Sequence, residues 1–371
     1  MERHPAPCGA PVAFPTMSPA PSVLFLDAAA GRPTTRTPVW FMRQAGRSLP
    51  EYRARRGSGS ILEAIKDPAL AAELTLQPVR RYGVDAAVLY SDIVVPAHAV
   101  GFGIDVAPGT GPVCERPFRS ADDLRRLRPL DATADTPYVL DTVRSLAHDL
   151  PRSVPLLAFA GAPFTVASYL IEGRPSRTYE HTKRLMHADA ALWHSLMERL
   201  VQHAVESISS QLMNGAAAYQ LFDSWAGSLS RVDYDRFVMP HSRAVFDQLR
   251  SRYPEAAGIH FGIGCDHILE SMHAAGPRVL GLDWRTSIAD ARRRMGDDLC
   301  VQGNLDPALV LAGVDIALAG TDAVLADNLR PDGSRHPGHI FNLGHGVNPA
   351  TDPEVLAAVV ERVRTVTEET R

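Results

Sequence analysis

The sequence predicts an α/β protein in which eight parallel strands close into a (β/α)8 barrel, the TIM-barrel fold. Short, largely apolar runs recur at eight places, namely residues 39–42, 86–90, 155–160, 217–222, 258–262, 279–282, 299–301 and 339–342. Segments with helical periodicity lie between them, each long enough to cross from one parallel strand to the next, including residues 67–82, 136–150, 190–213, 234–252, 266–275 and 315–328. This alternation is typical of a barrel in which helices follow strands.

An open, doubly wound sheet is the competing arrangement, because it also alternates strands with helices. No GxGxxG motif follows the first predicted strand, and unusual polar residues follow the strands throughout the chain and not at one crevice. Both features favour the barrel. The chain has no linker rich in Pro, Gly or Ser, so residues 22–371 are predicted to form a single domain. Residues 1–21, rich in Pro and Ala, are predicted to be a disordered tail.

Composition narrows the class of partner. The 371 residues are 45% hydrophobic with a formal net charge of -4, whereas nucleic-acid and membrane-surface partners favour a net basic protein. No run of eighteen apolar residues and no secretory signal pattern is visible, which predicts a cytoplasmic protein. The four cysteines show no close pairing, so neither a disulfide framework nor a structural zinc site is expected.

A cluster of arginines follows the first predicted strand. Arg43 and Arg47 lie four positions apart around Gly46, and three more arginines follow at positions 53, 55 and 56. A glycine lets the backbone approach a ligand closely, and guanidinium groups bind carboxylates with two parallel hydrogen bonds. A cationic loop in an acidic protein therefore indicates a ligand with several negative charges.

Polar residues follow six further strands at the same end of the predicted barrel. In a barrel the loops at the C-terminal ends of the strands build the active site, so these residues are expected to meet at one mouth. The segments are Tyr90-Ser91-Asp92, Gly161 to Tyr169, Phe222 to Gly227, Asp283-Trp284-Arg285, Gln302 to Pro307 and Gly344-His345-Gly346.

Taken together, these motifs resemble the uroporphyrinogen decarboxylase family of heme biosynthesis. The resemblance spans roughly residues 22 to 369 and rests on MRQAGR with LPEY, LYSDI, GAPFTVASYLIEG, LFDSWAG, HFGIG, GLDWR, VQGNLDP and FNLGHG in one order. It implies a (β/α)8 barrel, a homodimer and a carboxy-lyase that needs no cofactor. The implied substrate is uroporphyrinogen III, whose four acetate side chains lose carbon dioxide to give coproporphyrinogen III. Its eight carboxylates account for the arginines.

The chemistry requires an electron sink, which most decarboxylases take from a cofactor. A pyrrole protonated at the ring carbon that bears the acetate is such a sink, so the protein's task is to stabilise a transient positive ring. A fixed carboxylate in a water-poor site does this well. The resemblance places Asp92 at the centre of the macrocycle, where an ionised carboxylate accepts hydrogen bonds from pyrrole N–H groups.

The remaining site residues come from the same resemblance. Arg43 and Arg47 are expected to bind substrate carboxylates, and the proton donor is left open between Arg43, Tyr169 and a bound water, since arginine is a poor acid. Further substrate contacts are expected at Ala45, Arg56, Ser224 and His345.

Ordinary structural roles compete with each assignment. Arg53 and Arg55, taken alone, suit a solvated face, and Asp92 suits a helix N-cap. Four charged residues in the matching motifs are expected to be scaffold, as buried ion pairs and caps, namely Asp223, Asp283, Arg285 and Asp306. The chain departs from the family at Ser48, where the family usually has tyrosine, and altered packing with retained activity is expected.

Two other functions are considered. Related corrinoid or thiol methyltransferases bind zinc through a His-x-Cys motif, but the corresponding stretch here is His260-Phe261-Gly262, and glycine cannot bind zinc. A porphyrinogen-binding protein without catalysis is expected to keep the arginines and lack the central carboxylate, and Asp92 is present. Decarboxylation is therefore the preferred interpretation.

Overall fold

The structure is a computed structural model that describes residues 23–57, 59–107 and 109–369. The predicted tail, residues 1–21, lies outside the described residues. No helix in these described ranges is both long and apolar enough to cross a membrane.

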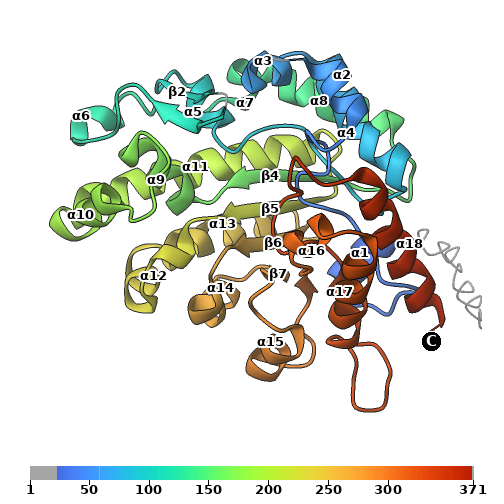
Figure 1. Cartoon of the computed structure of the whole chain (residues 1–371). Helices are drawn as coiled ribbons and strands as arrows, with labels where there is room; N and C mark the ends of the chain where they lie inside the picture. Colours follow the sequence, from blue (N-terminus) through green and yellow to red (C-terminus); the bar gives the residue numbers. More distant parts are fainter. Residues whose placement is uncertain (1–22, 58, 108, 370–371) are drawn as a thin grey trace, which may run out of the picture.

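Seven parallel strands form one curled sheet with helices on its outer side (Figure 1). Its order is β1-β4-β5-β6-β7-β8-β9, and each pair of neighbours is parallel. The strands are β1 (Ala87–Val88), β4 (Leu156–Gly161), β5 (Ala218–Asp223), β6 (Ala257–Gly262), β7 (Val279–Gly281), β8 (Val301–Gln302) and β9 (His339–Ile340). Seven of the eight predicted strands are therefore confirmed. They read as continuous apolar runs because both faces of the sheet are buried.

The predicted first strand, residues 39–42, is confirmed only as a single bridge between Val39 and Phe341. The N–H of Phe341 donates to the carbonyl of Pro38 at 2.8 Å, and on the other side the N–H of Asp85 donates to Val39 at 2.8 Å. Beyond this bridge, side chains take the place of the strand-to-strand hydrogen bonds. The Phe41 N–H donates to Oε1 of Gln44, and the Met42 N–H donates to Oδ1 of Asn342, both at 3.0 Å. The strand ends early for that reason.

The interior of the sheet contains a short polar chain. Trp40 Nε1 donates to Oε1 of Gln302 at 3.0 Å, and Nε2 of Gln302 donates to Oε1 of Gln220 at 2.9 Å. All three side chains are buried. Because buried polar groups are costly without partners, this chain fixes the relative positions of the first bridge, β5 and β8.

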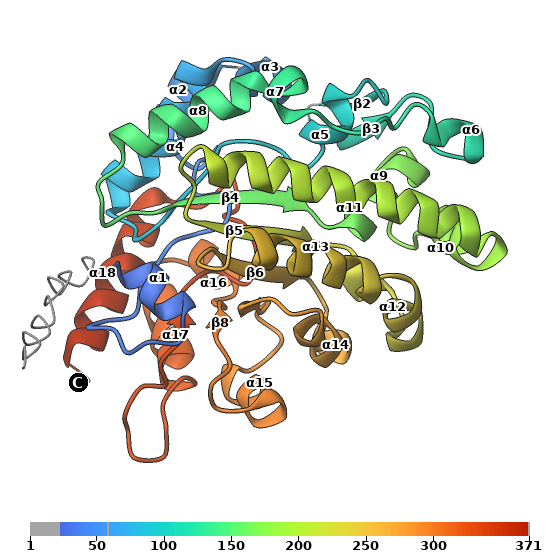
Figure 2. The ribbon, with the colours of Figure 1, turned by 180° about the vertical axis from the view of Figure 1, so that it is seen from behind.

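The long helices lie on the outside of the sheet (Figure 2), and all but the C-terminal one fall in segments whose periodicity predicts a helix. They are α4 (Pro68–Tyr82), α8 (Pro137–Asp149), α11 (Ala190–Met213), α13 (Met239–Arg252), α17 (Val314–Ala326) and α18 (Pro353–Glu369). The helix predicted over 234–252 is broken at Val238, because Pro240 begins a new helix and cannot continue the preceding one.

Shorter helices occupy the connections. They are α1 (Leu24–Ala29), α2 (Pro50–Arg56), α3 (Ile61–Ile65), α5 (Val95–Ala99), α6 (Ala121–Leu124), α7 (Ala132–Asp135), α9 (Pro163–Glu172), α10 (Glu180–Ala188), α12 (Arg231–Phe237), α14 (Leu269–Ala274), α15 (Ile288–Met295) and α16 (Pro307–Leu311), with 3-10 turns η1 (Ala226–Ser228) and η2 (Asp266–Ile268).

The structure also contains a hairpin that the sequence analysis did not foresee. Strands β2 (Ile104–Ala107) and β3 (Gly111–Cys114) pair antiparallel outside the main sheet. The Cys114 N–H donates to Gly173, and the Phe118 N–H to Leu170, both at 2.8 Å, which anchors this excursion to α9. Two four-residue strands give too weak an alternation for detection from sequence.

Candidate active site

The predicted site residues follow the C-terminal ends of strands that are neighbours in the sheet. Asp92 comes after β1, Tyr169 lies in α9 after β4, and Ser224 comes directly after β5. His345 comes after β9, beside the Val39 bridge that precedes Arg43. Parallel strands present these ends at one edge, so the segments share one side of the sheet.

Arg43 has an unusual backbone. Its φ is 59°, and Tyr179 at 54° is the only other non-glycine residue with positive φ in the described ranges. Such conformations are costly and are concentrated at functional sites. A Cβ on Gly346 would lie 2.4 Å from Cδ of Arg43, so this glycine is required for the arginine stem to pass. The stem is therefore held while the guanidinium is exposed.

Asp92 is half-buried, and one of its oxygens is engaged. Oδ1 accepts the N–H of Val94 at 3.0 Å, which resembles the predicted capping role, although α5 begins only at Val95. Burial raises the pKa of the Asp92 carboxyl, against the lowering effects of the Val94 N–H, the Arg43 charge and the Ile93 N–H. No side chain of the described residues donates a hydrogen bond to this carboxylate, whose partners are backbone N–H groups, so it keeps acceptor capacity for a ligand.

Arg43 is the electrostatic centre of the predicted set. Burial raises the pKa of Tyr169 to about 12; the Asp92 charge adds to this rise and the Arg43 charge opposes it. Burial, and then the charge of Arg43, lowers the pKa of His345. Because charge effects of this kind fall off with distance, Arg43, Asp92, Tyr169 and His345 lie near one another. The structure thus brings four predicted residues together.

His345 has a defined role as a hydrogen-bond donor. Its Nδ1 lies 2.7 Å from the Gly346 N and accepts that N–H, which leaves the ring proton on Nε2. The lowered pKa keeps this imidazole neutral near pH 7. A neutral ring presents one donor and no charge to a ligand.

The arginines of the loop divide into free and engaged groups. The guanidinium groups of Arg43, Arg47 and Arg55 have no hydrogen bond or ion pair with any residue that the structure describes, and all three are exposed. Arg53 is exposed, as predicted, but it is not free, because its Nη1 donates to the carbonyls of Arg47 at 2.6 Å and Ser48 at 3.1 Å. These hydrogen bonds of Arg53 stabilise the cationic loop.

Arg56 is partly engaged. Its two terminal nitrogens donate to Gly57 at 3.1 Å and Gly59 at 2.5 Å, while its buried Nε has no partner in the described part of the chain. Burial raises the pKa of Tyr90, and the nearby Arg56 guanidinium opposes that rise, so Arg56 lies beside the end of β1. Ala45 and Ser224 are half-buried.

The residues predicted as scaffold near β7 and β8 have that role. Nη1 of Arg285 lies 2.8 Å from Oδ2 of Asp283, and Asp306 accepts the Ala308 N–H at 2.9 Å as the N-cap of α16. Asp283 also accepts the Gly264 N–H at 2.5 Å, which ties the loop after β6 to the loop after β7.

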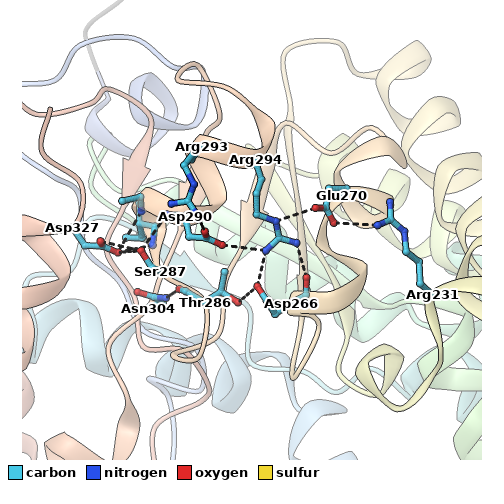
Figure 3. Close-up of polar contacts among 12 residues, drawn as sticks. Arg231, Asp266, Glu270, Thr286, Ser287, Asp290, Arg293, Arg294, Asn304 and Asp327 are labelled. Carbon is cyan, nitrogen blue, oxygen red and sulfur yellow. Dashed lines mark hydrogen bonds and ion pairs between the residues drawn. The ribbon is translucent and has the colours of Figure 1, made fainter. Parts of the chain in front are cut away.

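A charged network links the segments that follow β6 and β7 to α15 (Figure 3). Arg294 of α15 binds the carboxylates of Asp266 at 2.7 Å, Glu270 at 2.9 Å and Asp290 at 3.3 Å. The Thr286 hydroxyl donates to the same Asp266 carboxylate at 3.1 Å. Nδ2 of Asn304 completes the support by donating to the carbonyl of Thr286 at 2.6 Å.

Three residues at the site were not singled out from sequence. The Trp225 ring lies 5.9 Å from the Tyr169 ring and 5.8 Å from the Tyr179 ring, which builds an aromatic wall beside the mouth. Gln44 is buried and links the cationic loop to the start of β1 by donating to Ala86 at 3.1 Å. Trp225 and Gln44 lie inside recognised motifs, but no local signal marked Tyr179.

A small cavity lies behind Asp92. Its lining includes Ser91, Asp92 and Ile93 from the loop after β1, Phe159 from β4, and Gln211 from α11. It is far too small for a macrocycle, so the ligand site suggested by the arginines is the open mouth and not this cavity.

The fold and this site define an α/β protein with a parallel curled sheet and a cationic mouth around a half-buried carboxylate. Residues 20–366 match the uroporphyrinogen decarboxylase (URO-D) family, and the chain belongs to that family. It is 51% identical to uroporphyrinogen decarboxylase of Salinispora tropica, over 92% of this chain and 90% of the relative. Identity to the Streptomyces coelicolor enzyme of that name is 50%, over 92% and 94% of the two chains.

A solved structure shows the same fold. A methyltransferase from Methanosarcina mazei has a TM-score of 0.75 and 20% identity, and the match covers 92% of this chain and 97% of that one. At this identity the similarity concerns the fold alone.

Proposed function

We propose that this chain decarboxylates the four acetate side chains of uroporphyrinogen III and yields coproporphyrinogen III. The observation that carries the proposal is the exposed guanidinium of Arg43, which has no partner among the described residues and whose charge acts on the half-buried Asp92 carboxylate, with the equally unpaired Arg47 in the same loop. Relatives that are about 50% identical in sequence and are named uroporphyrinogen decarboxylase support it. A substrate with eight carboxylates around a ring of N–H donors matches both the cationic arginines and the anionic Asp92.

Each decarboxylation consumes one proton. Protonation of the ring carbon makes the pyrrole cationic, and the electrons of the bond to the carboxylate then move toward the ring as carbon dioxide leaves. The exocyclic carbon takes up a proton and the ring carbon releases one, so an acetate becomes a methyl group for one proton in total. The cationic ring is the species that the protein must stabilise.

Asp92 supplies that stabilisation in our proposal. Asp92 is half-buried, and this burial raises the pKa of its carboxyl, so the ionised form is less favoured than in water. A cationic pyrrole beside it restores a favourable environment, and the interaction is strongest where the positive charge is greatest. This is differential stabilisation of the reacting state.

The other site residues bind the substrate or supply its proton. Arg43, Arg47 and Arg56 pair with acetate or propionate carboxylates, while Ser224 and His345 donate neutral hydrogen bonds, and Ala45 shapes the wall. The pKa of Tyr169, about 12, keeps its hydroxyl protonated. At that pKa Tyr169 is almost as weak an acid as a guanidinium, so Arg43, Tyr169 and a water bound beside them all stay candidate proton donors.

The finer features of the fold belong to the same proposal. On one side of Val39, its neighbours Pro38 and Trp40 exchange backbone hydrogen bonds with Phe341, and on the other side Val39 accepts the N–H of Asp85. This segment therefore lies between the two ends of the sheet, which supports closure into an eight-stranded barrel. We further propose a single domain over 22–371, a homodimer, a cytoplasmic location and a reaction that needs no cofactor or metal.

The methyltransferase alternative loses support at its zinc motif. A Cβ on Gly262 would lie 2.5 Å from Sγ of Cys265, so a cysteine cannot simply replace this glycine. Within the described ranges, no group of three His, Cys, Asp or Glu side chains is arranged to hold a metal ion.

The proposal is tested by anaerobic incubation of metal-stripped protein with reduced uroporphyrinogen III, followed by oxidation and separation by carboxylate number. We expect products with seven, six, five and four carboxylates. Unchanged substrate that still binds would instead support a binding protein. Activity that appears only with zinc and a methylated corrinoid would support the methyltransferase.

A further inference from the structure

A buried carboxylate and a buried imidazole face each other at the ends of β5 and β6. Asp223 and His260 are both fully excluded from solvent, and Nε2 of His260 lies 3.5 Å from Oδ2 of Asp223. We propose that Asp223 and His260 form a charged pair that positions Ser224 and Trp225 at the mouth. The part of this inference that concerns catalysis rests on the function proposed above.

The charge of the pair is inferred from its buried polar atoms, which have no other partners. Oδ1 of Asp223 accepts from the Thr165 hydroxyl at 3.0 Å, but Oδ2 has no hydrogen-bond partner among the described residues, and neither ring nitrogen of His260 has one. A buried ionised carboxylate with one neutral donor is unstable, because its lost hydration is not replaced. A protonated His260 supplies both the missing donor and the opposite charge.

No other group near Asp223 can supply that charge. Tyr234 and Cys265 both interact electrostatically with Asp223, and burial raises the pKa of each, so both are neutral near pH 7. Among the residues that the structure describes, His260 is the one basic side chain within ion-pair distance of Asp223. Removal of one partner would therefore leave the other without compensation.

Helix α13 packs against the ring of His260, because the Phe246 ring lies 5.2 Å from it. Ser242, one turn earlier on that helix, is fully buried, and its hydroxyl lies near that of Tyr234. In the charged form Nδ1 of His260 also carries a proton, and one ordered water is sufficient to accept it.

The carboxylate is linked to the site through Thr165. The Thr165 hydroxyl donates to Asp223 and accepts the backbone N–H of Trp225 at 3.3 Å. Trp225 in turn contacts the ring of Tyr169. Ser224 lies between these two fixed residues, so a shift of the Asp223 carboxylate would move Ser224 and the aromatic wall together. Asp223 and His260 are positioning residues, since neither reaches the mouth.

The charge of the pair is tested first by NMR of protein labelled with 15N-histidine, with His260→Gln used to assign the His260 signals. We expect both ring nitrogens of His260 to carry protons near pH 7 in the wild type, and one of them to lose its proton in Asp223→Asn. His345 is the internal control and should be neutral in both proteins. A neutral His260 in the wild type would overturn the inference.

The positioning role is tested by comparing Asp223→Asn with Asp223→Glu. Asn keeps the volume and removes the charge, whereas Glu keeps the charge on a longer side chain. We expect kcat to fall about tenfold or more in Asp223→Asn, with a smaller change in KM, and partial recovery in Asp223→Glu. Equal or better activity of the Asn variant would show that shape and not charge matters.

The two proposals fail in distinguishable ways. The NMR measurement uses no substrate, so it decides the charge of the pair even if the wild type does not decarboxylate. If the wild type is active and Asp223→Asn keeps normal kcat and KM with the expected NMR change, the pair exists but does not position the site.

Discussion

Two arginine-rich regions of this protein use the same side chain in opposite ways. At the mouth, Arg43 and Arg47 expose guanidinium groups that have no partner among the described residues. After β7, Arg294 of α15 is held by the carboxylates of Asp266, Glu270 and Asp290 (Figure 3). The difference shows that a paired arginine serves the scaffold, whereas an unpaired arginine stays available for a ligand and its place in the fold must decide whether it binds one.

The largest expected effect comes from removal of the charge that faces the free arginines. Asp92→Asn should lower kcat by about a hundredfold to a thousandfold, as loss of one preorganised electrostatic group does elsewhere. Substrate affinity should change less. Steady-state kinetics of product formation measure both, and near-normal kcat would remove Asp92 from the mechanism.

The same variant should be more stable than the wild type near pH 7. The folded state raises the pKa of Asp92, so its ionised form costs stability above that pKa, and the cost disappears as pH falls and both states become protonated. The gain in melting temperature of Asp92→Asn should therefore be present at pH 7 and shrink toward pH 3. A variant that is less stable at pH 7 would contradict this.

The next effect separates free arginines from one another. Arg43→Ala should lower kcat/KM by about ten- to a hundredfold, the loss of a charge-assisted pair with a carboxylate. Arg55→Ala is the matched control, since Arg55 is equally exposed and unpaired among the described residues but is expected to face solvent. It should change kcat/KM less than twofold. Equal losses would mean that general charge attraction, and not a defined site, binds the substrate.

In the paired region, stability should respond and activity should not. Arg294→Met should lower the free energy of unfolding by about 2 kcal/mol, because three carboxylates lose a partly buried cation. Arg293→Ala is its control, since Arg293 is exposed and contacts only Asp290 in the described chain, and should cost under about 0.5 kcal/mol. Chemical denaturation measures both. A large loss of kcat in Arg294→Met without unfolding would break the comparison.

The smallest expected effect is at Ser48. This side chain is buried, and its hydroxyl has no partner among the residues described. Ser48→Ala removes an unsatisfied polar group, so stability should stay equal or rise by up to about 1 kcal/mol with unchanged kcat. Loss of stability would reveal a hydrogen bond from an ordered water.

Most strands, most long helices and part of the scaffold could be predicted from the sequence. The apolar runs of β4, β5 and β6 and the periodic segments of α4, α8 and α11 were located within a few residues, because burial on both faces of a strand and on one face of a helix leaves a strong pattern. The scaffold roles of Asp283 and Asp306 were also predicted correctly. The catalytic roles of the mouth residues stay predictions.

Other features had no local signal. The strand predicted from residue 39 ends after one bridge because Gln44 and Asn342, far apart in sequence, satisfy its backbone. The β2–β3 hairpin was missed, and the helix over 234–252 was predicted without its break. The partner Asn342 is distant in the chain, and the hairpin strands are too short for periodicity to show, whereas the helix break had a local signal in Pro240 that was overlooked.

The sequence by itself determined which residues are chemically unusual and that they follow strands, because residue type and strand order are local properties. Only the tertiary structure decided which charges are paired: it left Arg43 free beside Asp92, engaged Arg53 with loop carbonyls, and placed His260 against Asp223. The physical reason is that an ion pair depends on distance and burial, and both are set when separate segments pack together.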